Sequence, residues 1–182
     1  MSSLGMSFGR TRSLRIALLG SLLLLGAAVA GTVAPSPAKA ATTVQLKLTN
    51  APTNCVDVTN NDHVSGETLN LWNCSTGGSG TWNLITGIDC IEKTHTNCFE
   101  FQDPHNTKLC IGTPIDSDDY LILQTCGGTD STTSWYPEGS GHIGSGAYGA
   151  SHTMASYGIG NGAPMAEMIA PVPFGYWWTW SY

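Results

Sequence analysis

Apolar and polar residues alternate over short stretches along most of the chain after residue 40. Val44–Leu48 and Leu69–Trp72 both alternate with period two, the pattern of a strand with one buried face. Leu121–Leu123 is apolar throughout, as expected of a fully buried strand. Turn-forming clusters separate such stretches, and none of the stretches keeps a helical period; the clusters include residues 60–62, 65–67, 116–119 and 158–162. The pattern predicts an all-β chain of short strands.

The strands recur in three copies, each with a first anchor residue, a strand that runs to a second anchor, and a tryptophan. The anchors and tryptophans are Cys55, Cys74 and Trp82 in the first copy, Cys110, Cys126 and Trp135 in the second, and Met154, Ala170 and Trp180 in the third. The first anchor precedes the tryptophan by 27, 25 and 26 residues. Because a fixed period marks one structural unit repeated, we expect three homologous four-stranded repeats, approximately 41–88, 89–138 and 139–182.

Three such repeats could form a propeller, a solenoid or a closed threefold barrel. Three blades are few for a propeller, which usually has at least about four, and no polar solenoid cap is evident. A closed barrel suits three units and leaves no unpaired strand edge. We therefore favour the barrel, with the aromatic segment Tyr176–Tyr182 as its last strand. The alternative for that segment is an aromatic ligand surface made by Tyr176 or Trp177.

Residues 1–40 have the features of a secretory signal peptide. Three arginines precede an apolar run over residues 16–29, and Ala38–Ala40 has the small-x-small pattern of a cleavage site. The alternative is a transmembrane anchor, but the run is shorter than the roughly 18 apolar residues that a membrane span needs. We expect cleavage after Ala40 and a secreted, extracellular domain over residues 41–182.

The charge of residues 41–182 excludes several partners. These residues contain three lysines, no arginine and all 13 acidic residues of the chain. Such a surface repels phosphate, so we expect no nucleic-acid partner and no membrane partner after signal cleavage. A neutral ligand suits the composition, and we expect a monomer that needs no cofactor.

All six cysteines lie in residues 41–182, and export would place them in an oxidising compartment. Cys55 with Cys74 and Cys110 with Cys126 occupy equivalent places in two copies, which predicts one disulfide within each copy. Cys90 and Cys98 then form the third disulfide. A zinc site at Cys90, His95 and Cys98 is the alternative, but the two cysteines lack the short spacing of zinc ligands.

Known catalytic motifs are missing from residues 41–182. We find no nucleophile elbow and no metalloprotease motif, and the five histidines show no carboxylate partner in the sequence. Asp116, Asp118 and Asp119 fall in a turn, without the ligand spacing of a calcium-binding loop. The sequence therefore predicts neither an enzyme nor a metal site.

Two of the three copies resemble a subdomain of the ricin B-type lectins. The resemblance rests on Cys55–Val58, Leu69–Cys74 and Trp82, and again on Leu109–Gly112, Leu121–Cys126 and Trp135. It covers roughly residues 44–138 and implies a secreted β-trefoil that binds sugars in shallow pockets. The Gln-x-Trp motif of that family is incomplete, because Gly80, Thr133 and Trp178 stand at the glutamine positions.

The resemblance also implies one carbohydrate site in the first copy. Asp57 would accept hydrogen bonds from sugar hydroxyls, and Trp72 would stack on the sugar ring. Asn70 would support the site, and Ser79 would complete it. The alternatives are that Asp57 only accepts backbone N–H groups in a turn and that Trp72 belongs to the core. Period two places Trp72 with Asn70 and opposite Leu71, which favours an exposed ring.

The other two copies lack these groups. Gly112, Ile122 and Gln124 replace them in the second copy, while Ser156 and Met168 stand in the third. Trp82, Trp135 and Trp180 recur at one position and are expected in the core. We therefore predict a non-catalytic, secreted lectin-like domain with one sugar site. The alternative is a β-trefoil without sugar binding that acts by protein–protein contact, as an inhibitor or effector.

Overall fold

The computed structural model describes residues 41–75, 80–114, 120–127, 132–169 and 178–181, all within one folding unit, Pro37–Tyr182. The signal peptide expected at residues 1–40 lies outside these residues, as do Tyr176 and Trp177 and the turn acids at 116–119. Within the described ranges, no helix is long and apolar enough to span a membrane.

The described residues form short strands and two single-turn 3₁₀ helices. The strands are β1 (Thr42–Leu48), β2 (Ala51–Val58), β3 (Leu69–Asn73), β4 (Thr81–Ile88), β5 (Cys98–Gln102), β6 (Leu109–Gly112), β7 (Ile122–Thr125), β8 (Trp135–Pro137), β9 (Ile143–Ser145), β10 (Gly149–Ser156), β11 (Met165–Ile169) and β12 (Trp178–Ser181). The 3₁₀ turns are η1 (Thr59–Asn61) and η2 (Gly139–Gly141). Four strands fall to each repeat, so the all-β prediction is confirmed.

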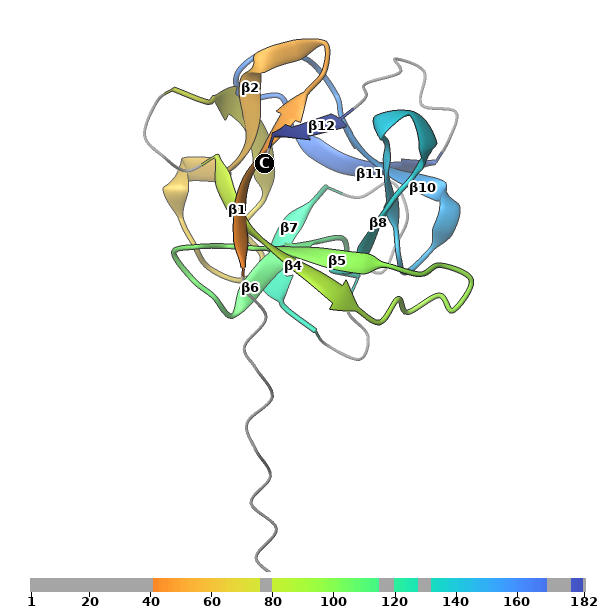
Figure 1. Ribbon diagram of the computed structural model, residues 1–182. Helices are drawn as coiled ribbons and strands as arrows, with labels where there is room; N and C mark the ends of the chain where they lie inside the picture. The colour runs from red at the N-terminus through yellow and green to blue at the C-terminus, as the bar shows by residue number, and fades with distance from the viewer. Residues whose placement is uncertain (1–40, 76–79, 115–119, 128–131, 170–177, 182) are drawn as a thin grey trace, which may run out of the picture. The chain divides into compact units, whose positions relative to one another are not determined.

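One set of strands forms the barrel (Figure 1). β1 pairs with β4, β4 with β5, β5 with β8 and β8 with β9, all antiparallel. The last strand, β12, pairs with β1, in a register that sets Trp178 against Leu48 and Ser181 against Gln45. The third repeat thus returns to the first through β12, as expected of the segment that ends the chain.

The other strands form three hairpins, β2–β3, β6–β7 and β10–β11. Isolated bridges join them in a cycle: Thr68 to Ile122, Tyr120 to Ala166, and Pro164 to Asn70. Backbone bonds follow the same cycle, since Leu69 N–H donates to the Leu121 carbonyl and Leu121 N–H to the Met165 carbonyl, both at 2.9 Å. Thr68, Tyr120 and Pro164 therefore occupy equivalent places around a pseudo-threefold axis.

The core lies between the barrel and the inner faces of the hairpins. Val56 faces Leu71 in the first hairpin and Ile111 faces Leu123 in the second, and all four are fully buried. Trp82 and Trp135 are buried as predicted. Their indole Nε1–H groups donate to the carbonyl oxygens of Val56 (3.1 Å) and Ile111 (3.0 Å), which satisfies the one polar group of each ring.

The third hairpin differs from the sequence alignment by one residue. The sequence pattern places Met154 at the position of Cys55, but Met154 pairs with Glu167, as Val56 pairs with Leu71. Thr153 is therefore the structural equivalent of Cys55. The cause is burial: an apolar methionine takes the inward-facing position of a strand, whereas the disulfide anchor lies on the other face. It follows that Ala155, and not Ser156, stands at the place of Asp57.

Three disulfides connect the cysteines, in the predicted pairs. The Cα–Cα distances are 5.1 Å for Cys55–Cys74, 5.3 Å for Cys90–Cys98 and 5.0 Å for Cys110–Cys126. Because Cys90 and Cys98 bond each other, neither is a thiolate ligand, and the zinc alternative at these residues is wrong. Loops of 19, 8 and 16 residues are closed, and each closure restricts the unfolded chain by about 2–3 kcal/mol.

Candidate functional site

The outward face of the β2–β3 hairpin carries the described residues that the sequence assigns to a sugar site. Asp57 lies directly opposite Asn70 in the register, and Trp72 follows Asn70 on the same face. Trp72 is 41% exposed, whereas Leu71 is fully buried. The alternation therefore turns the indole outward, so the alternative of a core tryptophan is wrong for this residue.

Asp57 is only 8% exposed, and its Oδ1 accepts a hydrogen bond from the N–H of Val58 at 2.7 Å. This contact is the one expected if Asp57 stabilises the backbone. A carboxylate offers about four acceptor positions, so a bond to one N–H is compatible with a second role toward a ligand hydroxyl.

Ser79, the fourth residue of the predicted site, lies outside the described residues. Its neighbour Gly80 shows why the Gln-x-Trp motif is broken here. A Cβ at Gly80 would lie 2.7 Å from the Cβ of Cys55, closer than real carbon contacts. The backbone of Gly80 rests against the Cys55–Cys74 disulfide, and a glutamine side chain has no room to start from this position.

The second repeat fills its own equivalent of the site. Gln124, at the place of Trp72, folds over Gly112, at the place of Asp57; a Cβ on Gly112 would lie 1.9 Å from Gln124 Nε2. That Nε2 donates to the Thr113 carbonyl (2.9 Å) and to Oγ1 of Thr132 (2.5 Å). Thr132 precedes Trp135 by as many residues as Ser79 precedes Trp82. The side chains of the chain itself thus occupy the space that a ligand would need.

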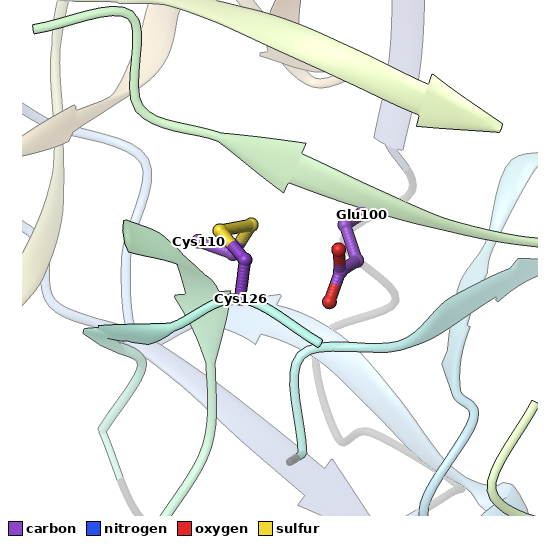
Figure 2. A group of neighbouring side chains, drawn as sticks. All are labelled: Glu100, Cys110 and Cys126. Atoms are coloured by element: carbon purple, nitrogen blue, oxygen red, sulfur yellow. A yellow bond between two sulfur atoms is a disulfide. The ribbon is translucent and has the colours of Figure 1, made fainter. Parts of the chain in front are cut away.

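Glu100 is a buried carboxylate beside the Cys110–Cys126 disulfide (Figure 2). It accepts hydrogen bonds from Oγ1 of Thr133 (2.5 Å) and from the N–H of Gly127 (2.8 Å). Both sulfur atoms are bonded to each other, so these three residues do not form a metal centre. Thr133 stands at the glutamine position of the second repeat, and its bond to Glu100 ties that position to β5.

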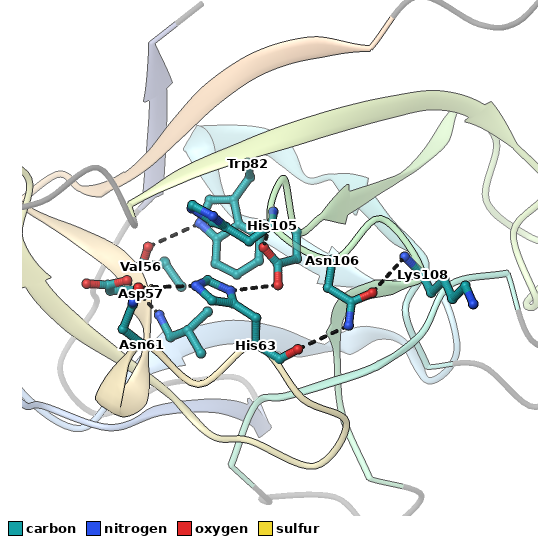
Figure 3. A network of polar contacts seen from close by, with 10 residues as sticks. Val56, Asp57, Asn61, His63, Trp82, His105, Asn106 and Lys108 are labelled. Carbon is teal, nitrogen blue, oxygen red and sulfur yellow. Dashed lines mark hydrogen bonds and ion pairs between the residues drawn. The ribbon is translucent and has the colours of Figure 1, made fainter.

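One histidine, His63, has a close carboxylate partner, contrary to the expectation from the sequence. Nδ1 of His63 lies 2.7 Å from Oδ2 of Asp103, a buried residue whose Oδ1 accepts the N–H of His105 at 2.8 Å (Figure 3). Asn106 Nδ2 donates to the carbonyl of His63 at 3.1 Å. Nε2 of His63 faces the amide oxygen of Asn61 at 3.1 Å. The network therefore joins the loop after β2 to the β5–β6 turn.

A second polar cluster joins the second repeat to the third. Tyr136 donates its phenol proton to Glu138 (3.1 Å), and Oγ1 of Thr153 donates to the other oxygen of that carboxylate (3.3 Å). The ring of His95 stacks on Tyr136 with centroids 3.8 Å apart. Burial, followed by the bond to Glu138, raises the pKa of Tyr136 well above its usual range. Burial lowers the pKa of His142, although the charge of Glu138 opposes that shift.

The described strands and the cyclic hairpin bridges define a β-trefoil. No model of a protein family and no curated protein matches the sequence. Solved structures do match. A designed threefold symmetric protein, ThreeFoil, is 14% identical, with 77% of this chain and 98% of that chain covered and a TM-score of 0.61.

Two natural structures show the same fold. The β-trefoil lectin of the Vibrio vulnificus hemolysin/cytolysin, solved with N-acetyl-D-lactosamine bound, is 21% identical; 78% of this chain and 95% of that chain are covered, with a TM-score of 0.56. A mosquitocidal holotoxin is 11% identical, with 78% of this chain covered and a TM-score of 0.62. This chain spans only 17% of the holotoxin chain. The fold expected from the sequence resemblance is confirmed.

Proposed function

We propose that the protein is a secreted, monomeric carbohydrate-binding domain without catalytic activity, with one sugar site on the β2–β3 hairpin. Asp57, Asn70, Trp72 and Ser79 form the site. The observation that carries the proposal is the half-exposed indole of Trp72 on the same face as the Asp57–Asn70 pair. Three disulfides are consistent with an oxidising, extracellular environment.

The chemistry suits a neutral sugar. The apolar C–H side of a sugar ring packs on an aromatic face, while a carboxylate and amides bond the hydroxyl groups. The strongly acidic composition disfavours anionic glycans. One shallow site with a single aromatic platform gives a Kd on the order of 1 mM, so useful avidity needs a clustered ligand.

The second repeat supports the inclusion of Ser79. Gly112, Gln124 and Thr132, at the places of Asp57, Trp72 and Ser79, lie within contact distance of one another. Ser79 precedes Trp82 by as many residues as Thr132 precedes Trp135, and we include it in the proposed site on this ground.

A glycan array tests the proposal on the exported protein. Trp72→Ala and Asp57→Asn should each abolish or strongly weaken binding of the wild-type ligands. Ile91→Ala, which trims another exposed apolar side chain in the Cys90–Cys98 segment, should leave binding unchanged. Thermal unfolding of each variant checks the fold. Binding that survives both site substitutions would refute this site, and no binding by folded wild type at high density would refute the function.

Protein–protein contact is the second candidate. Tyr157 and Ile159, on the turn between β10 and β11, are 55% and 50% exposed. A folded protein that binds no glycan would favour this function, as an inhibitor or effector. Hydrolysis of a polysaccharide panel, lost in the Trp72→Ala variant, would instead show that the protein is an enzyme.

A further inference from the structure

A pocket of about 200 Å³ lies where the three hairpins meet; it is lined by Thr59, Thr68, Leu69, Asn70, Tyr120, Gly162 and Pro164. Thr68, Tyr120 and Pro164 are the equivalent residues of the cyclic bridges. The pocket therefore lies at the pseudo-threefold axis and belongs to no single repeat. It is smaller than the roughly 300–1,000 Å³ that enclose drug-sized ligands, and its size suits a single sugar ring.

The pocket continues the face that carries the proposed sugar site. Asn70 belongs to both, and Thr59, just beyond the paired strands, donates its backbone N–H to the carbonyl of Thr68 at 3.0 Å. Their hydroxyl groups lie 3.1 Å apart, which confirms that they share a face. Alternate residues of a strand are about 6.6 Å apart. Trp72, Asn70 and Thr68 therefore form a row with the indole at one end and the pocket at the other.

The lining of the pocket is neutral. None of its seven residues carries a charge, while hydroxyl and amide groups come from Thr59, Thr68 and Asn70. Tyr120, from the second repeat, is 52% exposed and offers an aromatic face. The ring of Tyr157 contacts it edge-on, with centroids 5.9 Å apart, and restrains its orientation. An aromatic wall with a few hydrogen-bonding groups recognises a neutral, hydroxylated ring.

We propose that this axial pocket is a second sugar subsite, so that the ligand is a neutral glycan chain of two or more rings. One ring stacks on Trp72, and a later ring of the same chain enters the pocket against Tyr120. This inference rests on the proposed function. It adds a residue of the second repeat to the site, although the second repeat has no site on its own hairpin.

The test compares binding of a single sugar ring with binding of a glycan chain. Isothermal titration with methyl α-D-galactoside and with the four-ring tandem repeat of N-acetyl-D-lactosamine gives the affinity of the exported protein for each. Tyr120→Ala should weaken binding of the four-ring glycan about five- to tenfold, the effect of one aromatic contact. The affinity for the single-ring galactoside should stay within twofold of wild type. Tyr120→Phe should restore the chain affinity. Trp72→Ala should weaken both, and Ile91→Ala neither.

Three results would overturn the proposal, and they separate it from the proposed function. If Tyr120→Ala leaves chain binding unchanged while Trp72→Ala abolishes it, the sugar site stands and the axial subsite is wrong. If the wild-type protein binds neither probe, the proposed sugar site and the axial subsite are both wrong for galactose-type glycans. If Tyr120→Ala lowers the melting temperature, Thr68→Val replaces it as the pocket variant. Unchanged chain binding by a folded Thr68→Val then refutes the subsite.

Discussion

Removal of the Asp103 carboxylate should destabilise the protein more than any surface substitution. Asp103 is fully buried and accepts two hydrogen bonds, one from the ring of His63 and one from the backbone of His105. Asp103→Ala removes both acceptors and leaves the N–H of His105 without its carboxylate. The loop from Thr59 to Val64, which supplies Thr59 to the axial pocket, would keep the bond from Asn106 to the His63 carbonyl as its attachment to the β5–β6 turn.

The expected cost follows from these two bonds. A hydrogen bond to a charged group contributes about 1.5–3 kcal/mol, and breaking a buried pair by removing one partner costs roughly 3–5 kcal/mol. The His63 side chain is 15% exposed, so water partly compensates for the loss. We expect about 3 kcal/mol for Asp103→Ala. Asp103→Asn keeps an acceptor for His105 and should cost about 1–2 kcal/mol.

Urea unfolding under non-reducing conditions measures both values. With a slope of about 1–3 kcal/mol per molar for a domain of this size, Asp103→Ala should lower the midpoint by roughly 1–3 M. A double-mutant cycle with His63→Ala isolates the side-chain pair. A loss below about 0.5 kcal/mol, or a cycle without coupling, would show that the bond between the two repeats does not form in solution.

Two further predictions concern packing and pH. Gly80→Ala should lower the free energy of unfolding by about 1–3 kcal/mol through overpacking against Cys55. Gly139→Ala, which adds its methyl group in open space, should not lower it. Equal melting temperatures of the two variants would contradict the close contact between Gly80 and Cys55. The burial that lowers the pKa of His142 favours its neutral form in the folded state. As the pH falls, the unfolded chain therefore binds a proton at His142 before the folded chain does. The melting temperature should fall as the pH drops through about 6.5. His142→Gln should show a smaller fall than wild type over the same pH range, and an identical profile would refute this origin of the pH dependence.

The repeat and its periodicity predict the short strands and favour a closed threefold barrel, and the family resemblance implies the β-trefoil. The strand pattern is predictable because it depends on local alternation. Alternation in Leu69–Trp72 places Leu71 inside and Trp72 outside whatever the rest of the chain does. The disulfides followed from equivalent places in two repeats. The sequence pattern places the third hairpin one residue out of register because this hairpin has no cysteine to mark the anchor. In the structure Met154 is buried opposite Glu167.

Contacts between repeats could not be predicted in this way. His63 and Asp103 are 40 residues apart, and nothing near either one signals the other. The axial pocket also depends on contacts between repeats. Thr68, Tyr120 and Pro164 belong to three different repeats, and only the bridges between the hairpins bring them together. Tyr120 is half-exposed and lines this pocket together with Asn70.

The difference between the first two repeats shows how the sequence could indicate a lost site. A glycine at the place of Asp57 removes the carboxylate, and it also makes room for the side chain that replaces Trp72. Gln124 uses that room and bonds Thr132, the equivalent of Ser79. The two changes depend on each other, because a Cβ at position 112 would collide with Gln124 in its present place. Paired replacement of the acidic and aromatic residues, more than the loss of either one, therefore marks a hairpin that has filled its own pocket.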